Sequence, residues 1–244
     1  MLSAFELAPS ILAWVAVLTF AAAFVQGTLG FGYAIVTVPL MALVDSRLAP
    51  AVQLIQMIPL IFAIYWRERS HADWTGVFWT TLGRFPGTYL GMLLLAVASQ
   101  RSLDLIIGSM VLVAVFSLRG ERAIRRTKAI ELIAGVCSGG AAVVSAIGGP
   151  PIALLYKDSK GAEARATLSA IFGVGLFVTI AGRAWAGKLT ALDLSLGVWT
   201  MPLVMLGFVA SKHATRWIEG PRLRFGILLL CTLAALALIG KAVV

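Results

Sequence analysis

A single arginine, Arg84, lies near the centre of the apolar segment of residues 74–97. A charged side chain at the middle of a membrane-spanning segment is energetically costly and usually serves a function. The planar guanidinium group can donate two parallel hydrogen bonds to the oxygens of a carboxylate, a sulfonate or a phosphate. Arg84 is therefore the leading candidate for an anion-binding group. The structural alternative is a guanidinium that donates to helix carbonyls or snorkels to an interface.

Two glycine-rich clusters offer a second kind of anion chemistry. The first reads QGTLGFG at residues 26–32 and precedes Pro39, and the second reads SGGAAVVSAIGGPP at residues 138–151. Glycine allows the chain to turn inside an apolar segment, and proline fits the first turn of a returning helix. Bare N–H groups at such a helix start attract anions. The alternative is that the glycines only let helices approach closely.

Polar side chains in or near the clusters could donate further hydrogen bonds. Gln53 and Gln56 stand about one helical turn apart in the next apolar segment and face the same way, either toward a ligand or toward another helix. The candidate substrate-binding residues are therefore Arg84, Gln26, Gly27, Thr28, Gly30, Gly32, Gln53, Gln56, Ser138, Gly139, Gly140, Ser145, Gly148 and Gly149. Two further arginines, Arg165 and Arg183, lie close to segment ends, which favours interfacial anchoring.

The segments that carry these residues have the composition of membrane helices. Of the 244 residues, 60% are hydrophobic and only 13% are charged, and the mean hydropathy is +0.95. Six apolar stretches approach or reach the ~20 residues that cross a bilayer as a helix. They are 48–66, 74–97, 103–118, 164–182, 192–210 and 223–240, whereas the regions 10–44 and 129–156 are apolar but broken by glycines. The sequence therefore predicts an all-α integral membrane protein.

The two halves of the chain share a weak internal repeat. A shift of 112 residues places Gly27 on Gly139 and Pro39 on Pro151. The spacing P-x-x-x-L-G also occurs twice, at residues 86–91 and 202–207. We therefore predict repeat 1 at residues 1–118, a basic cytoplasmic linker at 119–128 and repeat 2 at 129–244. Each repeat would contain one glycine-broken hairpin, at 10–44 or 129–156, and three transmembrane helices.

The distribution of Lys and Arg distinguishes two arrangements of the broken regions. If each region crosses the membrane once, the cations divide ten against nine, Arg84 excepted. If each region returns as a hairpin, one side keeps only five cations and the other fourteen collect together, which is a positive-inside pattern. The five are Arg47, Arg101, Arg183, Lys188 and Lys241. The hairpin arrangement predicts two inverted-topology repeats, with both termini periplasmic.

The sequence lacks the residue patterns that several classes of activity require. Cys137 and Cys231 have no CxxC spacing, and His71 and His213 stand singly, so the sequence predicts no metal site. None of the eleven carboxylates lies at the middle of an apolar segment, where a proton relay would need one. A phosphate-binding loop and a paired nucleophile and base are also missing. We therefore expect no enzyme activity and no cofactor, and we assign the net charge of +9 to membrane orientation rather than to nucleic acid.

The two clusters resemble the TauE/SafE family of sulfite exporters, the TSUP permeases. The resemblance rests on QGTLGFGYAIVTVPL at residues 26–40, SGGAAVVSAIGGPPIALL at residues 138–155 and the repeated P-x-x-x-L-G spacing, and it extends from about Ala13 to Gly240. It implies a multi-pass protein of the bacterial inner membrane whose partners are lipids and a small sulfur-containing anion, such as sulfite, sulfoacetate or another organosulfonate.

These observations together predict a secondary transporter that exports such anions, driven by the membrane potential, with its site at the hairpin tips near the bilayer midplane. Two other classes of function stay open at this point. A channel-like anion facilitator would use the same hairpins. A membrane anchor or assembly protein would use the glycine clusters only as packing surfaces and would not need Arg84.

Overall fold

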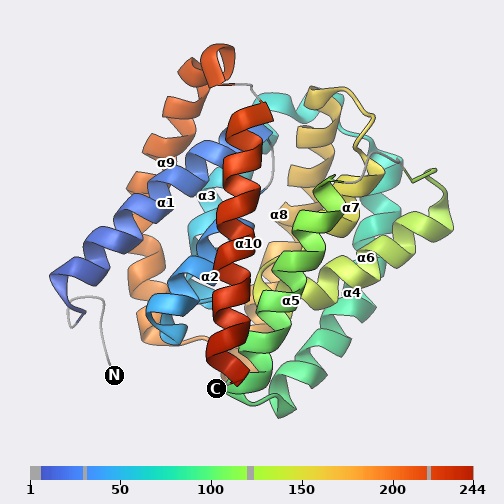
Figure 1. Cartoon of the computed structure of the whole chain (residues 1–244). Coiled ribbons are helices and arrows are strands. Elements are labelled where there is room, and N and C mark those ends of the chain that lie inside the picture. The colour runs from blue at the N-terminus through green and yellow to red at the C-terminus, as the bar shows by residue number, and fades with distance from the viewer. Residues whose placement is uncertain (1–6, 30–31, 120–123, 219–220, 244) are drawn as a thin grey trace.

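The protein is entirely helical over the residues that the computed structural model describes, which are 7–29, 32–119, 124–218 and 221–243. These residues form ten α-helices, and the helical prediction is confirmed (Figure 1). The helices are α1 (Pro9–Leu29), α2 (Tyr33–Val44), α3 (Ala51–Glu68), α4 (Trp74–Val97), α5 (Gln100–Arg119), α6 (Lys128–Ser145), α7 (Gly149–Leu155), α8 (Gly161–Trp185), α9 (Ala191–Ile218) and α10 (Pro221–Val243).

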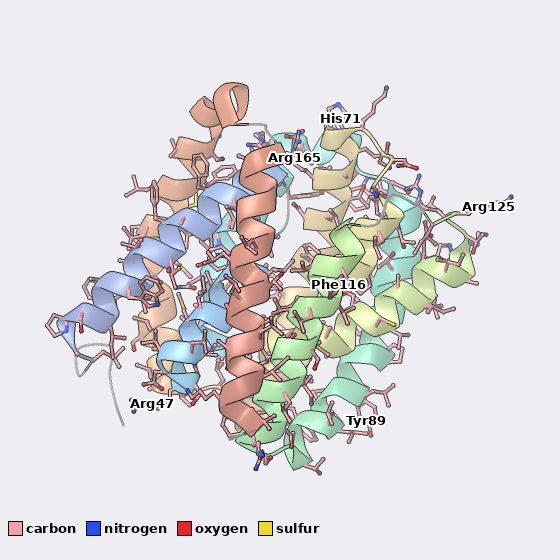
Figure 2. The ribbon with its side chains drawn as sticks, in the orientation of Figure 1. Arg47, His71, Tyr89, Phe116, Arg125 and Arg165 are labelled. Carbon is pink, nitrogen blue, oxygen red and sulfur yellow. The ribbon has the colours of Figure 1, made fainter. Side chains whose placement is uncertain are left out.

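The distribution of polarity is that of a membrane protein. Large apolar side chains lie on the outside, including Phe78 at 59% exposed and Phe116 at 64% exposed, and Figure 2 shows Phe116 on the outer face of α5. Polar side chains such as Gln53, Gln56 and Thr88 are buried between helices. Apolar side chains are favoured where a protein faces the lipid hydrocarbon, whereas polar groups need hydrogen-bond partners inside the protein. The chain is therefore a multi-pass membrane protein.

Five described helical segments are long and apolar enough to cross a bilayer. They are Pro9–Thr28, Ser46–His71, Lys128–Ser145, Gly161–Trp185 and Ala191–Lys212. The segment 74–97 is a helix of 24 residues, but it is absent from this set, because Arg84 and several glycines and threonines lower its hydropathy. The first leg of each glycine-broken region, α1 or α6, is therefore long enough to span by itself. Figure 1 shows both legs running obliquely, in contrast to α10.

The two helix breaks are narrower than the glycine clusters suggest. Gly32 precedes α2 with a φ of 112°, in the left-handed region that favours glycine. In the second half α6 continues through its glycines to Ser145, and only residues 146–148 separate it from α7. Pro150 and Pro151 lie in the first turn of α7, as predicted. Pro39 lies inside α2 instead, so the prediction of a first-turn proline is wrong for that half.

Helices of the first half pack mainly against helices of the second. The helix α1 packs against α9, α6 packs against α4, α3 against α8, and α5 against α10. The first helix of each half, α1 or α6, thus packs against the fourth helix of the other half, α9 or α4. These contacts bring residues that are far apart in the sequence together in the apolar core.

The loops collect at two opposite ends of the bundle. We call one the Glu68 end, which comprises residues 67–73, 124–128 and 156–165. Arg165 donates to Glu68 at 2.9 Å, and Arg126 contacts Asp73 at 2.9 Å and Glu163 at 3.6 Å. These ion pairs tie the loops of both halves together, and Figure 2 shows His71 and Arg165 at this end.

We call the other end the Arg47 end, which comprises residues 45–51, 95–103 and 183–193, together with the last turn of α10. Arg101 donates to the Val243 carbonyl at 2.7 Å, which brings α10 to this end. The Arg47 guanidinium donates to both oxygens of Asp45 and holds the pKa of that carboxyl below its ordinary value. Figure 2 places Arg47 opposite His71 and Arg165.

The contact between α4 and α6 depends on glycines in both helices. A Cβ atom on Gly83 or Gly87 would overlap a backbone carbonyl of α6, and one on Gly139 would overlap the Arg84 carbonyl. Such backbone proximity is how small residues pack membrane helices. It also fixes the position of Arg84, which lies between Gly83 and Gly87 along α4.

We expect Gly87→Ala to destabilise the protein, because neither backbone can yield to the added methyl group. Overpacking of this kind costs about 1–3 kcal/mol, and thermal unfolding in detergent measures it as a lower midpoint. Gly240→Ala is the matched control, since a Cβ atom there meets nothing within 4 Å. Equal midpoints for the two variants would contradict this account of the contact.

Candidate functional site

A small cavity lies where the two helix breaks meet. Gly32 lines it from the first break, and Gly148 and Gly149 line it from the second. Arg84 and Gln26 contribute polar groups, and α3 and α8 supply apolar walls. The cavity volume is about 40 Å³, more than the ~10–15 Å³ that one water molecule requires. The site suits a ligand of a few heavy atoms.

Arg84 is held in place by its hydrogen-bonding and packing contacts. Its Nη1 donates to the Ser138 hydroxyl at 2.7 Å, and that hydroxyl donates to the Gly148 carbonyl at 2.6 Å. The guanidinium carbon lies 5.7 Å from the centre of the Phe172 ring, within the range of a cation–π contact. It also lies against Gly175 of α8, where a Cβ atom would overlap it. The guanidinium therefore connects α4, α6 and α8.

The charge of Arg84 is not neutralised by the described part of the protein. The side chain is 4% exposed, and no described carboxylate forms an ion pair with it. Its Nε atom is buried without a hydrogen-bond partner. A desolvated cation with a free donor beside a cavity is a strong attractor for an anion. A sulfonate or sulfite presents oxygens that could accept from such a group.

The helix start at the first break is not bare, contrary to the expectation from sequence, and the second break has a side-chain acceptor for Ile147, two residues before α7 begins. The Tyr33 N–H donates to the Gln26 side-chain oxygen at 2.9 Å, and the Ile147 N–H donates to the Ser145 hydroxyl at 3.2 Å. Gln26 and Ser145 thus stabilise the two breaks by accepting hydrogen bonds from backbone N–H groups. Gln26 still lines the cavity, whereas Ser145 does not.

The two glutamines of α3 form hydrogen bonds between helices. Gln56 accepts from the Tyr33 hydroxyl at 2.8 Å and donates to Thr19 at 3.1 Å and to Thr200 at 2.7 Å. Gln53 donates to the Leu48 carbonyl at 3.1 Å and to the Met41 sulfur at 2.9 Å. Neither glutamine lines the cavity. Their geometry agrees with the second alternative that the sequence left open.

The remaining predicted residues lie outside the cavity lining. Gly27 packs against Ser211 and Phe208 of α9, and Gly139 and Gly140 lie in α6 at its contact with α4. Thr28 donates to the Val25 carbonyl at 2.7 Å within its own helix. Gly30 lies outside the described residues. The structure therefore brings together Arg84, Ser138, Gln26, Gly32, Gly148 and Gly149.

The contribution of α8 is missing from the sequence prediction. Phe172, Leu176 and Thr179 line the cavity. Their spacing of three and four residues is that of one helix face, but any buried apolar helix carries this pattern. Gly175, on the same face, leaves the space that the Arg84 guanidinium fills.

Arg183 is also misassigned by the sequence. Its side chain is only 5% exposed, and its Nη1 donates to the Val143 carbonyl at the end of α6. The prediction of an interfacial anchor is therefore wrong for Arg183. Proximity to a helix end in the sequence does not report whether another helix covers that end.

A metal site finds no support in the described residues, because no three of their His, Cys, Asp and Glu side chains form a group that could hold an ion. Comparison with curated proteins and with solved structures gives no match. The model of the sulfite exporter TauE/SafE family matches residues 15–238, which include both helix breaks, Arg84 and the whole of α8. The chain belongs to the sulfite exporter TauE/SafE family.

Proposed function

We propose that this protein is a secondary transporter that exports small sulfur-containing anions, such as sulfite, sulfoacetate or a related organosulfonate, across the bacterial inner membrane. The observation that carries the proposal is the buried Arg84 guanidinium, which faces the central cavity without a carboxylate partner among the described residues. Membership in a family of sulfite exporters supports an anion of this class.

The geometry of the cavity favours a small, oxygen-rich ligand. The free Nε of Arg84 supplies a donor, and the Ser138 hydroxyl positions the guanidinium from the other side. Two or more oxygens on one sulfur atom could accept from the planar donor fork at once. The walls from α3 and α8 are apolar, and the lower local dielectric constant strengthens each electrostatic contact.

Export of an anion from a negative-inside cell needs no coupling ion. Each elementary charge that leaves gains roughly 2.3 kcal/mol per 100 mV of membrane potential. The buried acids of the described residues, Asp104, Glu131 and Asp193, lie within about one turn of a helix start rather than at mid-membrane. A potential-driven carrier is the simplest mechanism for this set of residues.

We further propose that the chain consists of two inverted repeats with the Glu68 end in the cytoplasm. The ion pair between Arg165 and Glu68 supports a hairpin at the second glycine break, since a single crossing by residues 129–156 would put these two residues on opposite sides. The described cations of the larger group, including Arg67, Arg126 and Lys157, then share the cytoplasmic side. Alternating access would follow from movement of the two breaks around the central site.

Counterflow in proteoliposomes tests the proposed function. The vesicles are preloaded with unlabelled sulfite, sulfoacetate, taurine or sulfate, and entry of the same labelled anion is followed with the membrane potential clamped at zero. Transient accumulation of one sulfur-containing anion supports a carrier and names its substrate. Conductive leakage without counterflow would assign the site to a channel. An absence of flux with every anion would contradict transport of this class.

Site-directed labelling tests the proposed orientation. In a background without Cys137 and Cys231, we expect an impermeant maleimide added to intact cells to label Arg101→Cys but not Arg125→Cys. Both side chains are exposed, and they lie near opposite ends of the bundle. The two introduced cysteines should therefore react equally well with a maleimide and differ only in the side of the membrane that they face. Labelling of Arg125→Cys before the cells are broken would reverse the orientation.

A further inference from the structure

A second cavity opens at the Arg47 end of the protein. It has a volume of about 590 Å³, far larger than the central cavity, and it lies among the turns that join α2 to α3, α4 to α5 and α8 to α9. Three cationic side chains line it, Arg47, Arg183 and Lys188, against one acidic side chain, Asp193. We call this cavity the vestibule. Its lining favours anions over cations.

Arg183 stands between the vestibule and the central cavity. Thr179 of α8 lines the central cavity, and Arg183 lines the vestibule four residues later. Residues separated by four positions lie on one face of a helix, about one turn apart. On the opposite wall, Ala142 of α6 lines the central cavity, and the neighbouring Val143 accepts a hydrogen bond from Arg183.

The guanidinium of Arg183 has unused binding capacity. Its side chain is 5% exposed, and its Nε atom is buried without a partner. No ion pair joins it to a carboxylate in the described parts of the chain. Asp193 also faces the vestibule and interacts electrostatically with Arg183, but it forms no ion pair with it, and its carboxylate accepts from the N–H and the hydroxyl of Thr190, each at 2.7 Å. Arg183 therefore repeats the two features that single out Arg84, burial and a free donor.

We propose that Arg183 is a second anion-binding residue, which holds a small oxyanion at the inner wall of the vestibule after it leaves Arg84. This inference rests on the proposed function, because it assigns the next position on the path of the same substrate. Arg84 in the central cavity and Arg183 in the vestibule each offer the anion a guanidinium group. The two cavities are about one turn of α8 apart, so the anion has a charged partner before and after this step. Lys188 then attracts anions to the mouth of the vestibule, whereas the charge of Arg47 is paired with that of Asp45.

Protection of an introduced cysteine tests the second site without transport. Ala191 is exposed and lines the vestibule, so Ala191→Cys in a background without Cys137 and Cys231 reports on this cavity. The rate of labelling by N-ethylmaleimide, a neutral reagent, is measured with and without methanesulfonate on the purified protein in nanodiscs. We expect methanesulfonate to slow labelling in the parent protein and in Arg84→Gln, because the two sites are separate.

Replacement of the second arginine should remove that protection. We expect Arg183→Gln to raise the half-protecting concentration of methanesulfonate by about tenfold or more, the effect of losing a charge-assisted hydrogen bond. Arg101→Gln is the matched control, because Arg101 is exposed at the same end and does not line the vestibule. Protection that is absent from the parent, or that survives Arg183→Gln as it survives Arg101→Gln, would overturn the proposal.

Transport provides a second, side-specific measurement. In proteoliposomes that carry sulfite, we expect Arg183→Gln to raise the half-saturating concentration at the Arg47 end by about tenfold and to change that at the Glu68 end by less than about threefold. Arg183→Lys keeps the charge but loses the fork, so we expect an intermediate shift. If Arg183 only caps α6 through the Val143 carbonyl, its replacement should change the half-saturating concentration equally at both ends. This result would also overturn the proposal.

The two proposals fail in different ways. If the parent protein moves no sulfur-containing anion, the proposed function fails, while cysteine protection still reports on the vestibule. If the parent transports sulfite and Arg183→Gln matches Arg101→Gln in both measurements, the second site fails and the proposed function stands.

Discussion

Arg84→Gln is expected to abolish sulfite counterflow while the protein still folds. Glutamine can reach toward Ser138, but it carries no charge and lacks the planar fork of donors. Hydrogen bonds to charged groups are worth about 1.5–3 kcal/mol each, so loss of two from the bound anion reduces affinity by at least about a hundredfold. Removal of a desolvated cation also relieves a burial cost, and we therefore expect thermal stability to be unchanged or higher.

Two further variants give this result its meaning. Arg84→Lys retains the charge without the fork, so partial flux in that variant would separate electrostatic attraction from bidentate binding. Arg125→Gln makes the same chemical change at an exposed arginine and should leave counterflow within about twofold, the behaviour of a surface site. Full flux in Arg84→Gln, at a normal expression level, would reassign Arg84 to a structural role.

Gly175→Ala is expected to reduce transport although it replaces no group that binds the anion. The added Cβ atom would overlap the Arg84 guanidinium, which is the flexible end of a long side chain and must therefore move. A displacement of about 1 Å at a site of this kind can cost on the order of a hundredfold in rate. We expect a loss of that size in sulfite counterflow, with the protein still folded.

Gly173→Ala is the matched control, two residues away on the same helix. A Cβ atom there meets only the Ile61 side chain, at an ordinary contact distance of 3.7 Å. We expect counterflow within about twofold of the parent, because the helix gains only an alanine at a position with room for it. Equal loss in both variants would mean that α8 resists any change, and the specific link from Gly175 to Arg84 would be rejected.

Local sequence properties were enough to predict the class of the protein and to single out Arg84, which is buried and lines the central cavity. Hydropathy sums over about 20 residues, so the helical spans are visible without knowledge of their neighbours. The cost of a charge in hydrocarbon rises toward the centre of a span, and Arg84 is conspicuous for that reason. The glycine clusters predicted two breaks in the helices, since a turn at membrane depth requires residues that tolerate it.

The tertiary structure decided which glycines turn the chain and which pack helices together. Gly32 has a positive φ at its break, whereas Gly139 lies inside the uninterrupted helix α6, against the backbone of α4. Both belong to clusters that look alike in the sequence. Gln56 also depended on a distant partner, Thr200, which lies 144 residues away. A one-dimensional pattern carries no information about such partners.

Arg183 shows most clearly what could not be predicted from the sequence. Its position near the end of an apolar segment predicts an interfacial anchor, whereas packing of α8 against other helices, α4 and α6 among them, buries it. The partner that holds it is the Val143 carbonyl, which is a backbone group and leaves no trace in the residue types. The sequence by itself determined that the protein spans a membrane and carries a buried cation. The tertiary structure decided which cations are buried together, because burial depends on segments that meet only after the chain has folded.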